Sequence, residues 1–255
     1  MQPRFHLDAG SARIAITHRS QTALFTEIAA RFRDRRGFAL ATVNLDHLVK
    51  LHESETFRQA YSAHDLVVAD GNPIVWMSRL AANPVELVPG SDLLVPLVRL
   101  ATEAEVPVAL VGATGQVLEQ ASAYLEREIP GVNIATRHAP ALGFDAEGAE
   151  AGQILDALAQ TPARLVLLAL GAPRQEIFAA RGYTALPEVG FASIGAGLDF
   201  LAGHQQRAPR WVRRIAMEWL WRMLSNPRRL AMRYLRCALI LPGLALQALA
   251  QRRGR

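Results

Sequence analysis

The feature of the sequence that most constrains the fold is an alternation of short apolar runs with segments of helical spacing. The run at 165–170, LVLLAL, is apolar at every position rather than at every second one. A strand with one solvated face alternates apolar and polar residues, so this run predicts a strand buried on both faces. Such strands alternating with helices are typical of a parallel sheet between two helical layers. We therefore predict an α/β fold with a Rossmann-like, mostly parallel sheet and helices on both faces.

The expected elements follow one another through most of the chain. Strands are expected at 38–45, 66–69, 108–112, 132–136, 165–170 and 191–195. Helical spacing is found at 22–36, 46–63, 91–105, 116–128, 149–160 and 175–182. Asp46 and Ser91 are expected N-caps, and Gly37 is expected to close the first helix in a left-handed conformation.

The charge of the chain is divided unevenly between its two ends. Residues 204–255 hold twelve arginines, no lysine and one acid, a net charge of +11. The whole chain carries +5, so residues 1–203 carry −6. We predict an α/β core over 1–203 and a basic helical appendage over 204–255. Its charge favours an anionic partner: nucleic acid, anionic lipid or a diphosphate.

The appendage also has the pattern of an amphipathic helix. Apolar residues from Trp211 to Leu224 recur at helical spacing, and arginines occupy the opposite face. The uncharged run at 237–251 is about fifteen residues long and contains Pro242 and Gly243, whereas a transmembrane helix takes about 20 apolar residues. With arginine and tryptophan intermixed, this pattern predicts a helix that binds the membrane interface.

Polar and glycine-bearing turns follow five of the expected strands. They lie at 44–46, 70–73, 112–115, 171–176 and 195–199. Ligands of such sheets bind beyond the carboxyl ends of the strands, so these turns predict a nucleotide-sized cleft. Gly112, Gly171 and Gly195 would let backbone amides approach a diphosphate.

Several signatures of other chemistries are missing from the sequence. The single cysteine excludes a disulfide framework, and no D-x-D pair, phosphate-binding P-loop or nucleophile elbow is found. The seven histidines show no metal-ligand spacing, and His47 and His52 are expected on the surface of one helix. We therefore expect no metal and no cofactor.

Eight blocks in one order give the sequence a specific resemblance. They are TVNLDHL (42–48), VVADGNPIVW (67–76), PGSDLL (89–94), LVGATG (110–115), LALGAPRQE (168–176), IGAGLDFLAG (194–203), RAPRW (207–211) and EWLWRMLSNPRRLAMRYL (218–235). Together they resemble the WecG/TagA/CpsF glycosyltransferase family. The resemblance implies inverting transfer from a UDP-sugar to a saccharide on a polyprenyl diphosphate, in cell-surface or exopolysaccharide synthesis. It also implies a cytoplasmic enzyme, peripheral on the inner face of the cell membrane.

The resemblance assigns roles to individual residues. Asp70 falls at the catalytic general base, Gln175 at an active-site glutamine, and Thr42 and Asn44 at polar neighbours of the base. Other substrate-binding positions that we expect are Asn72, Gly112, Gly171, Pro173, Glu176, Gly195, Asp199, Arg207, Arg214, Arg222 and Arg229. Leu87 departs from the pattern, because the family has an arginine just before its G-x-D-L block.

Plainer interpretations of these residues stay open. Asp70 with Gly71 forms an ordinary turn sequence, Glu176 suits the dipole of a helix start, and Asp199 suits a helix cap. Two other functions are also possible for the chain: a Rossmann-type oxidoreductase and a nucleic-acid-binding protein. The first lacks the third glycine of G-x-G-x-x-G, since Phe200 stands there. Against the second, the basic tail of the chain ends in an uncharged run, so we expect the tail to bind lipid and not nucleic acid. A homo-oligomer is left open.

Overall fold

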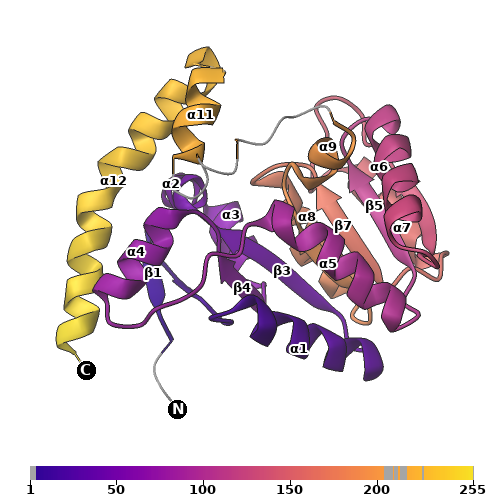
Figure 1. Ribbon diagram of the computed structural model, residues 1–255, viewed down its shortest axis with the longest axis horizontal. Coiled ribbons are helices and arrows are strands. Elements are labelled where there is room, and N and C mark those ends of the chain that lie inside the picture. Colours follow the sequence, from indigo (N-terminus) through magenta and orange to yellow (C-terminus); the bar gives the residue numbers. More distant parts are fainter. Residues whose placement is uncertain (1–3, 204–208, 210–211, 213–216, 226, 255) are drawn as a thin grey trace.

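Six parallel strands form the central sheet of the computed structural model (Figure 1). The structure describes residues 4–203, 209, 212, 217–225 and 227–254. The strands are β3 (Phe38–Val43), β4 (Leu66–Ala69), β5 (Val108–Gly112), β6 (Ile134–His138), β7 (Leu165–Ala169) and β8 (Gly190–Ser193). Their order across the sheet is β4-β3-β8-β7-β5-β6, and each neighbouring pair is parallel. The predicted fold class is confirmed.

The order of the strands creates a switch in the direction of winding. After β4 the chain crosses to β5 in the other half of the sheet, and β7 and β8 later fill the space between β5 and β3. Such a switch leaves a crevice at the carboxyl ends of the strands.

The helices are α1 (Gln21–Arg33), α2 (Leu45–Glu53), α3 (Glu55–Ser62), α4 (Asn72–Leu80), α5 (Gly90–Glu103), α6 (Gly115–Glu128), α7 (Ala149–Ala159), α8 (Arg174–Ala185), α9 (Gly197–Leu201), α11 (Glu218–Ser225) and α12 (Pro227–Arg253).

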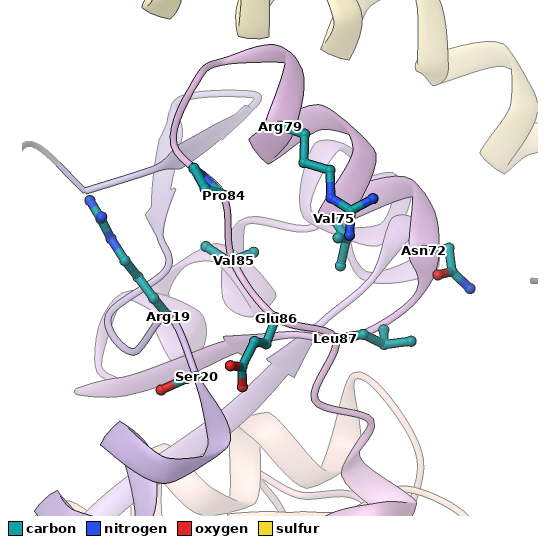
Figure 2. A pocket seen from close by; sticks show the side chains of 9 residues that line it. All are labelled: Arg19, Ser20, Asn72, Val75, Arg79, Pro84, Val85, Glu86 and Leu87. Carbon is teal, nitrogen blue, oxygen red and sulfur yellow. The ribbon is translucent and has the colours of Figure 1, made fainter. Parts of the chain in front are cut away.

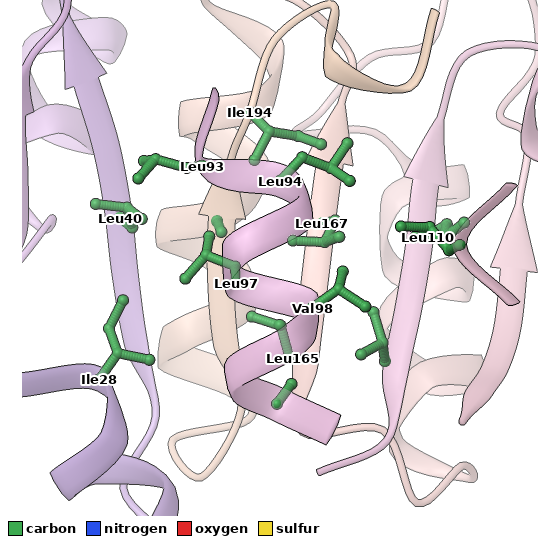
Figure 3. Close-up of a cluster of buried hydrophobic side chains, with 14 of the residues drawn as sticks. Ile28, Leu40, Leu93, Leu94, Leu97, Val98, Leu110, Leu165, Leu167 and Ile194 are labelled. Carbon is green, nitrogen blue, oxygen red and sulfur yellow. The ribbon is translucent and has the colours of Figure 1, made fainter. Parts of the chain in front are cut away.

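Both faces of the sheet are buried over β3, β4, β5, β7 and β8, as the run at 165–170 predicts, whereas the edge strand β6 is half-buried. Leu165 and Leu167 of β7 pack with side chains of α1, α5 and α6 on one face (Figure 3). Val166 and Leu168 pack with side chains of α7 and α8 on the other face. All four side chains are fully buried. The alternation of side chains along a strand divides one apolar run between two cores.

The helix expected at 46–63 is two helices in the structure. α2 ends at Glu53, and the Ser54 side chain accepts the amide hydrogen of Phe57 at the start of α3. A serine side chain that makes this capping bond competes with the backbone hydrogen bonds of a continuous helix, so it favours a break between two helices. The helical spacing of the apolar residues persists through the break, which explains the wrong prediction.

The three helix ends assigned from the sequence are also wrong. Asn44 rather than Asp46 caps α2, and α5 begins at Gly90, one residue before Ser91. After α1 the left-handed residue is Arg35, with φ of 51°. Gly37 is required by packing instead, because a Cβ there would lie 2.3 Å from the carbonyl oxygen of Val189.

A small antiparallel hairpin was not expected from the sequence. It consists of β1 (His6–Ala9) and β2 (Ala12–Ala15). Its strands HLDA and ARIA contain one β-branched residue, Ile14, and no Phe, Tyr or Trp, so they lack the composition that marks a strand. The hairpin contacts α12: the Gln251 side chain donates to the backbone oxygen of His6 at 2.8 Å, and Gln247 accepts from the Asp8 amide at 3.2 Å.

Helix α12 runs along one side of the molecule, next to α4, α2 and β1 (Figure 1). It continues through Pro242 and Gly243, and its segment Leu230–Arg253 is long and apolar enough to cross a membrane by length and composition. This length exceeds what the uncharged run at 237–251 suggested. The helix is consistent with a membrane-binding appendage, and the boundary at residue 204 stays a prediction.

Candidate active site

The centre of the candidate site is a contact between Asn44 and Asp70. The two residues follow the neighbouring parallel strands β3 and β4, whose last residues, Val43 and Ala69, are paired. The Asp70 amide continues the ladder by donating to the Val43 oxygen at 2.8 Å. Asn44 Nδ2 lies 3.3 Å from Asp70 Oδ2. The sheet register thus brings together two polar side chains that are 26 residues apart in the chain.

The capping bond of α2 fixes which way the Asn44 amide points. Asn44 Oδ1 accepts the backbone amide hydrogen of His47 at 3.1 Å. The amide nitrogen of Asn44 is then the atom that faces Asp70, and it is a donor. On the other side of Asp70 the chain turns through Gly71, with φ of 81°. A residue with a side chain rarely adopts this conformation, so glycine is favoured here.

Thr42 lies beside this pair but faces α5. Its side chain is buried, and a Cβ added to Gly90 would lie 3.1 Å from Thr42 Oγ1. The hydroxyl therefore sits at the start of α5, next to the end of β3. The structure brings Thr42 to the predicted edge of the sheet.

Gln175 and Glu176 are buried at the start of α8. Gln175 Nε2 donates to Glu176 Oε1 at 2.7 Å. Gln175 Oε1 and Glu176 Oε2 are buried and have no hydrogen-bond partner among the described residues. A buried acceptor without a partner costs about 1–3 kcal/mol, which a ligand donor would offset. Burial raises the pKa of Glu176 to about 7, opposed by the Gln175 hydrogen bond.

The expectation that His47 lies on the surface is wrong, whereas His52 is exposed as expected. His47 is 5% exposed, its Nδ1 is 3.2 Å from the Tyr61 hydroxyl, and its Nε2 is 3.9 Å from Glu176 Oε1. Burial lowers the pKa of His47 to about 3, so the ring is neutral. Burial, and then the charges of Glu176 and Asp70, raise the pKa of Tyr61. His47 and Tyr61 thus form a buried polar pair next to Glu176.

The three glycines expected to approach a diphosphate differ in their surroundings. Gly171 and Gly195 have φ of 71° and 60°, and a Cβ at either one would meet open space. Gly112 has a structural reason to be glycine: a Cβ there would lie 2.5 Å from the backbone carbon of Ala169 on β7. Pro173 precedes α8 and follows a cis peptide bond.

The remaining predicted residues are spread more widely. Asn72 is the first residue of α4, and Asp199 lies in the first turn of α9. Arg222 lies in α11 and Arg229 in α12, where their backbones alone are described. Arg207 and Arg214 lie outside the described residues. The role of the appendage arginines therefore stays a prediction.

A pocket of about 630 Å³ opens beside Asn72, two residues after Asp70 (Figure 2). Asn72 and Leu87 stand at one end of it, Arg19 at the other, and Arg79 lies over Val75. The remaining lining residues are Ser20, Pro84, Val85 and Glu86. The lining thus combines five polar or charged side chains with four apolar ones. Leu87, where the resemblance leads us to expect arginine, contributes an apolar wall.

Within the part of the chain that the structure describes, no group of three or more His, Cys, Asp or Glu side chains is placed to hold a metal ion. Independence from metal stays a prediction to be tested in solution.

A comparison with known protein families now identifies the chain. Residues 11–255 match the model of the WecG/TagA/CpsF glycosyl transferase family. The chain belongs to this family. It is therefore a glycosyltransferase, as the eight sequence blocks indicated, and family membership does not support the oxidoreductase or the nucleic-acid-binding alternative.

One relative of this WecG/TagA/CpsF glycosyltransferase is a Bacillus transferase. Over 211 residues the chain is 26% identical to the N-acetylglucosaminyldiphosphoundecaprenol N-acetyl-beta-D-mannosaminyltransferase of Bacillus spizizenii. The aligned region covers 82% of this chain and 79% of the relative.

Sequence reasoning missed His47, Tyr61 and Lys50 as residues around the candidate site of this glycosyltransferase. His47 and Leu51 are four residues apart, a spacing that puts both on one helix face, and Leu51 is fully buried. This spacing was the available signal for a buried His47. No signal in the sequence pointed to Lys50, whose Nζ donates to the backbone oxygen of Ala172 at 2.9 Å.

Proposed function

We propose that this chain transfers a sugar from a UDP-sugar to a saccharide carried on a polyprenyl diphosphate, with inversion at the anomeric carbon. The observation that carries the proposal is the contact of Asn44 Nδ2 with Asp70 Oδ2 at the carboxyl ends of two parallel strands. Family membership and the relative's acceptor, named as an N-acetylglucosaminyl diphosphoundecaprenol, support the substrate classes. The cellular role that we propose is cell-surface polysaccharide synthesis.

Asp70 acts as the general base in this proposal. It removes the proton of the acceptor hydroxyl while that oxygen attacks the anomeric carbon and the bond to UDP breaks. Such a base contributes about 10²–10⁴-fold to the rate. The Asn44 amide holds the carboxylate in place by donating to one oxygen. Basic groups of the appendage and backbone amides near Gly171 and Gly195 would stabilise the negative charge of the departing UDP.

Gln175 is the second residue that we place in the site. Its Oε1 is buried without a partner among the described residues, next to the buried Glu176. A sugar hydroxyl could satisfy this acceptor once substrate enters. The pocket beside Asn72 is proposed to hold the acceptor saccharide, since two arginines, a glutamate, a serine and an asparagine offer it hydrogen bonds beside four apolar side chains.

We further propose that the enzyme works on the cytoplasmic face of the cell membrane as a peripheral protein. Leu235, Leu239 and Leu246 of α12 are exposed, and the appendage carries a net charge of +11. An apolar surface with surrounding arginines suits a layer of anionic lipid.

The test is a release assay with the full-length protein in detergent. The reaction contains a panel of UDP-sugars, a polyprenyl-diphosphate saccharide and EDTA. Acceptor-dependent release of UDP from one donor is expected, and its persistence in EDTA would establish metal independence. A folded protein that releases no UDP with any donor, with or without added divalent metal, would contradict the proposed function.

A further inference from the structure

A continuous series of polar contacts joins α12 to the loop before Gln175. Arg233 Nε of α12 lies 3.0 Å from Asp46 Oδ1, and Lys50 Nζ lies 2.7 Å from Asp46 Oδ2. Lys50 Nζ also donates to the backbone oxygen of Ala172 at 2.9 Å. Ala172 lies in the β7–α8 loop, three residues before Gln175. The appendage is therefore linked to the candidate site through two side chains of α2.

The central carboxylate of this series is well shielded from water. The side chain of Asp46 is 11% exposed, that of Lys50 is 31% exposed and that of Arg233 is 45% exposed. Charges at a partly buried site interact more strongly than at the surface, because water and salt screen them less. The contacts of Asp46 with Arg233 and Lys50 should therefore be stronger than an ion pair on the exposed surface.

A second ion pair joins the same two helices without reaching the loop. Arg236 of α12 lies 3.5 Å from Glu53 of α2, and both side chains are more than half exposed. Exposed pairs of this kind contribute little to stability. The chain thus contains a matched control for Arg233, three residues further along the same helix.

We propose that Asp46 is a positioning residue through which docked α12 holds the β7–α8 loop in place for Gln175. With Arg233 on Oδ1, Asp46 leaves Oδ2 to Lys50, which can also reach the Ala172 carbonyl. Without Arg233, Lys50 is the one cation left on Asp46 among the described residues, so it is drawn toward both oxygens and away from the loop. The part that concerns catalysis rests on the proposed function, because it takes Gln175 as an active-site residue.

The structural part is tested by hydrogen exchange in the full-length protein. The amides of Gln175 and Ile177 donate to Gly171 and Pro173, so they report on the loop. Arg233→Gln should speed their exchange about tenfold, the size expected for a lost charge-assisted hydrogen bond, and Arg233→Lys should restore part of the protection. Arg236→Gln should leave exchange unchanged. Equal effects of Arg233→Gln and Arg236→Gln would overturn the proposal.

The catalytic part is tested by kinetics and a double-mutant cycle. Arg233→Gln should lower kcat about tenfold with little change in the KM of the UDP-sugar, because it disturbs the position of Gln175. Lys50→Gln should have a similar effect, and the double variant should be no worse than either single one. Additive losses would show that Arg233 and Lys50 act independently and would overturn the proposal.

The two proposals can fail separately. If the wild-type protein releases no UDP with any donor while exchange still distinguishes Arg233→Gln from Arg236→Gln, the proposed function fails and the coupling stands. If transfer occurs but neither exchange nor kcat distinguishes the two variants, the coupling fails and the function stands.

Discussion

Asn44 places its amide nitrogen 3.3 Å from Asp70 Oδ2 while its oxygen caps α2 by accepting the His47 amide hydrogen. One side chain thus begins a helix and orients the proposed base. The cap determines the direction of the amide, so a substitution can remove the donor to Asp70 and keep the cap.

Variants of Asn44 should separate these two tasks. Serine also caps helices well, so Asn44→Ser should leave the free energy of unfolding within a few tenths of a kcal/mol of wild type. It lacks the amide donor, so UDP release should fall about tenfold. Asn44→Ala should lose both the helix cap and the donor to Asp70, so activity should fall and the free energy of unfolding should drop by about 1 kcal/mol. Denaturant unfolding and the release assay measure the two effects. Full activity of a folded Asn44→Ser protein would show that the contact with Asp70 does not serve catalysis.

Replacing Asp70 tests the general base directly. Asp70→Asn keeps the size of the side chain and removes its ability to take a proton, so the rate of transfer should fall about 10²–10⁴-fold. Binding of UDP, measured by calorimetry, should persist. Asp156→Asn on the exposed side of α7 makes the same chemical change far from the strand ends and should retain activity. Near-normal transfer by Asp70→Asn would refute the assignment.

The buried carboxyl of Glu176 should make stability depend on pH. Burial raises its pKa from 4.5 to about 7, so the folded state holds a proton that the unfolded state releases. The stabilisation that this bound proton gives the folded state is fully present below pH 4.5, and it is lost as the pH rises through about 7. The total change is about 3 kcal/mol. Glu176→Gln carries no such proton.

The measurement for Glu176 is the difference in free energy of unfolding between wild type and Glu176→Gln from pH 4 to 8. The variant should gain relative stability as pH rises between about 4.5 and 7. Taking the difference removes the opposite trend of His47, whose lowered pKa costs stability as pH falls. A difference that does not vary with pH would mean that the Glu176 carboxyl has an ordinary pKa.

The exposed apolar side chains of α12 should govern membrane binding. Changing Leu235, Leu239 and Leu246 to serine removes apolar surface worth roughly 1.5–3 kcal/mol per side chain if buried in lipid. Sedimentation with vesicles containing anionic lipid should fall more than tenfold. Leu142→Ser removes an exposed leucine from a loop between β6 and α7 and should bind like wild type. Unchanged sedimentation of the triple variant would rule out α12 as the docking surface.

Arg79 should contribute to acceptor recognition through the pocket beside Asn72. Arg79→Gln should raise the KM of the polyprenyl-diphosphate saccharide about tenfold and leave UDP binding unchanged, because a charge-assisted hydrogen bond is lost. Arg99→Gln on the exposed side of α5 is the matched control. An unchanged KM for the acceptor would show that it binds elsewhere.

The sequence by itself determined the class of the fold. A run such as 165–170 can bury every side chain only between two layers, so its pattern required a sheet covered on both faces. The polar turns after the strands likewise placed Asp70 and Gln175 at one edge, because parallel strands end on the same side. The ends of helices were harder to predict from the sequence. A cap depends on one side-chain hydrogen bond, and the spacing of apolar residues does not reveal that bond, as Asn44 and Ser54 show.

Only the tertiary structure decided which of these groups meet. The register of β3 with β4 brings Asn44 to Asp70, and the packing of α3 on α8 buries His47 and Tyr61 near Glu176. Docking of α12 on α2 makes the link through Asp46 and Lys50 to Ala172. These contacts join segments far apart in the chain, and their energies depend on burial. Local sequence patterns do not report which distant segments meet; at most they indicate that a residue is buried, as the spacing of His47 and Leu51 does.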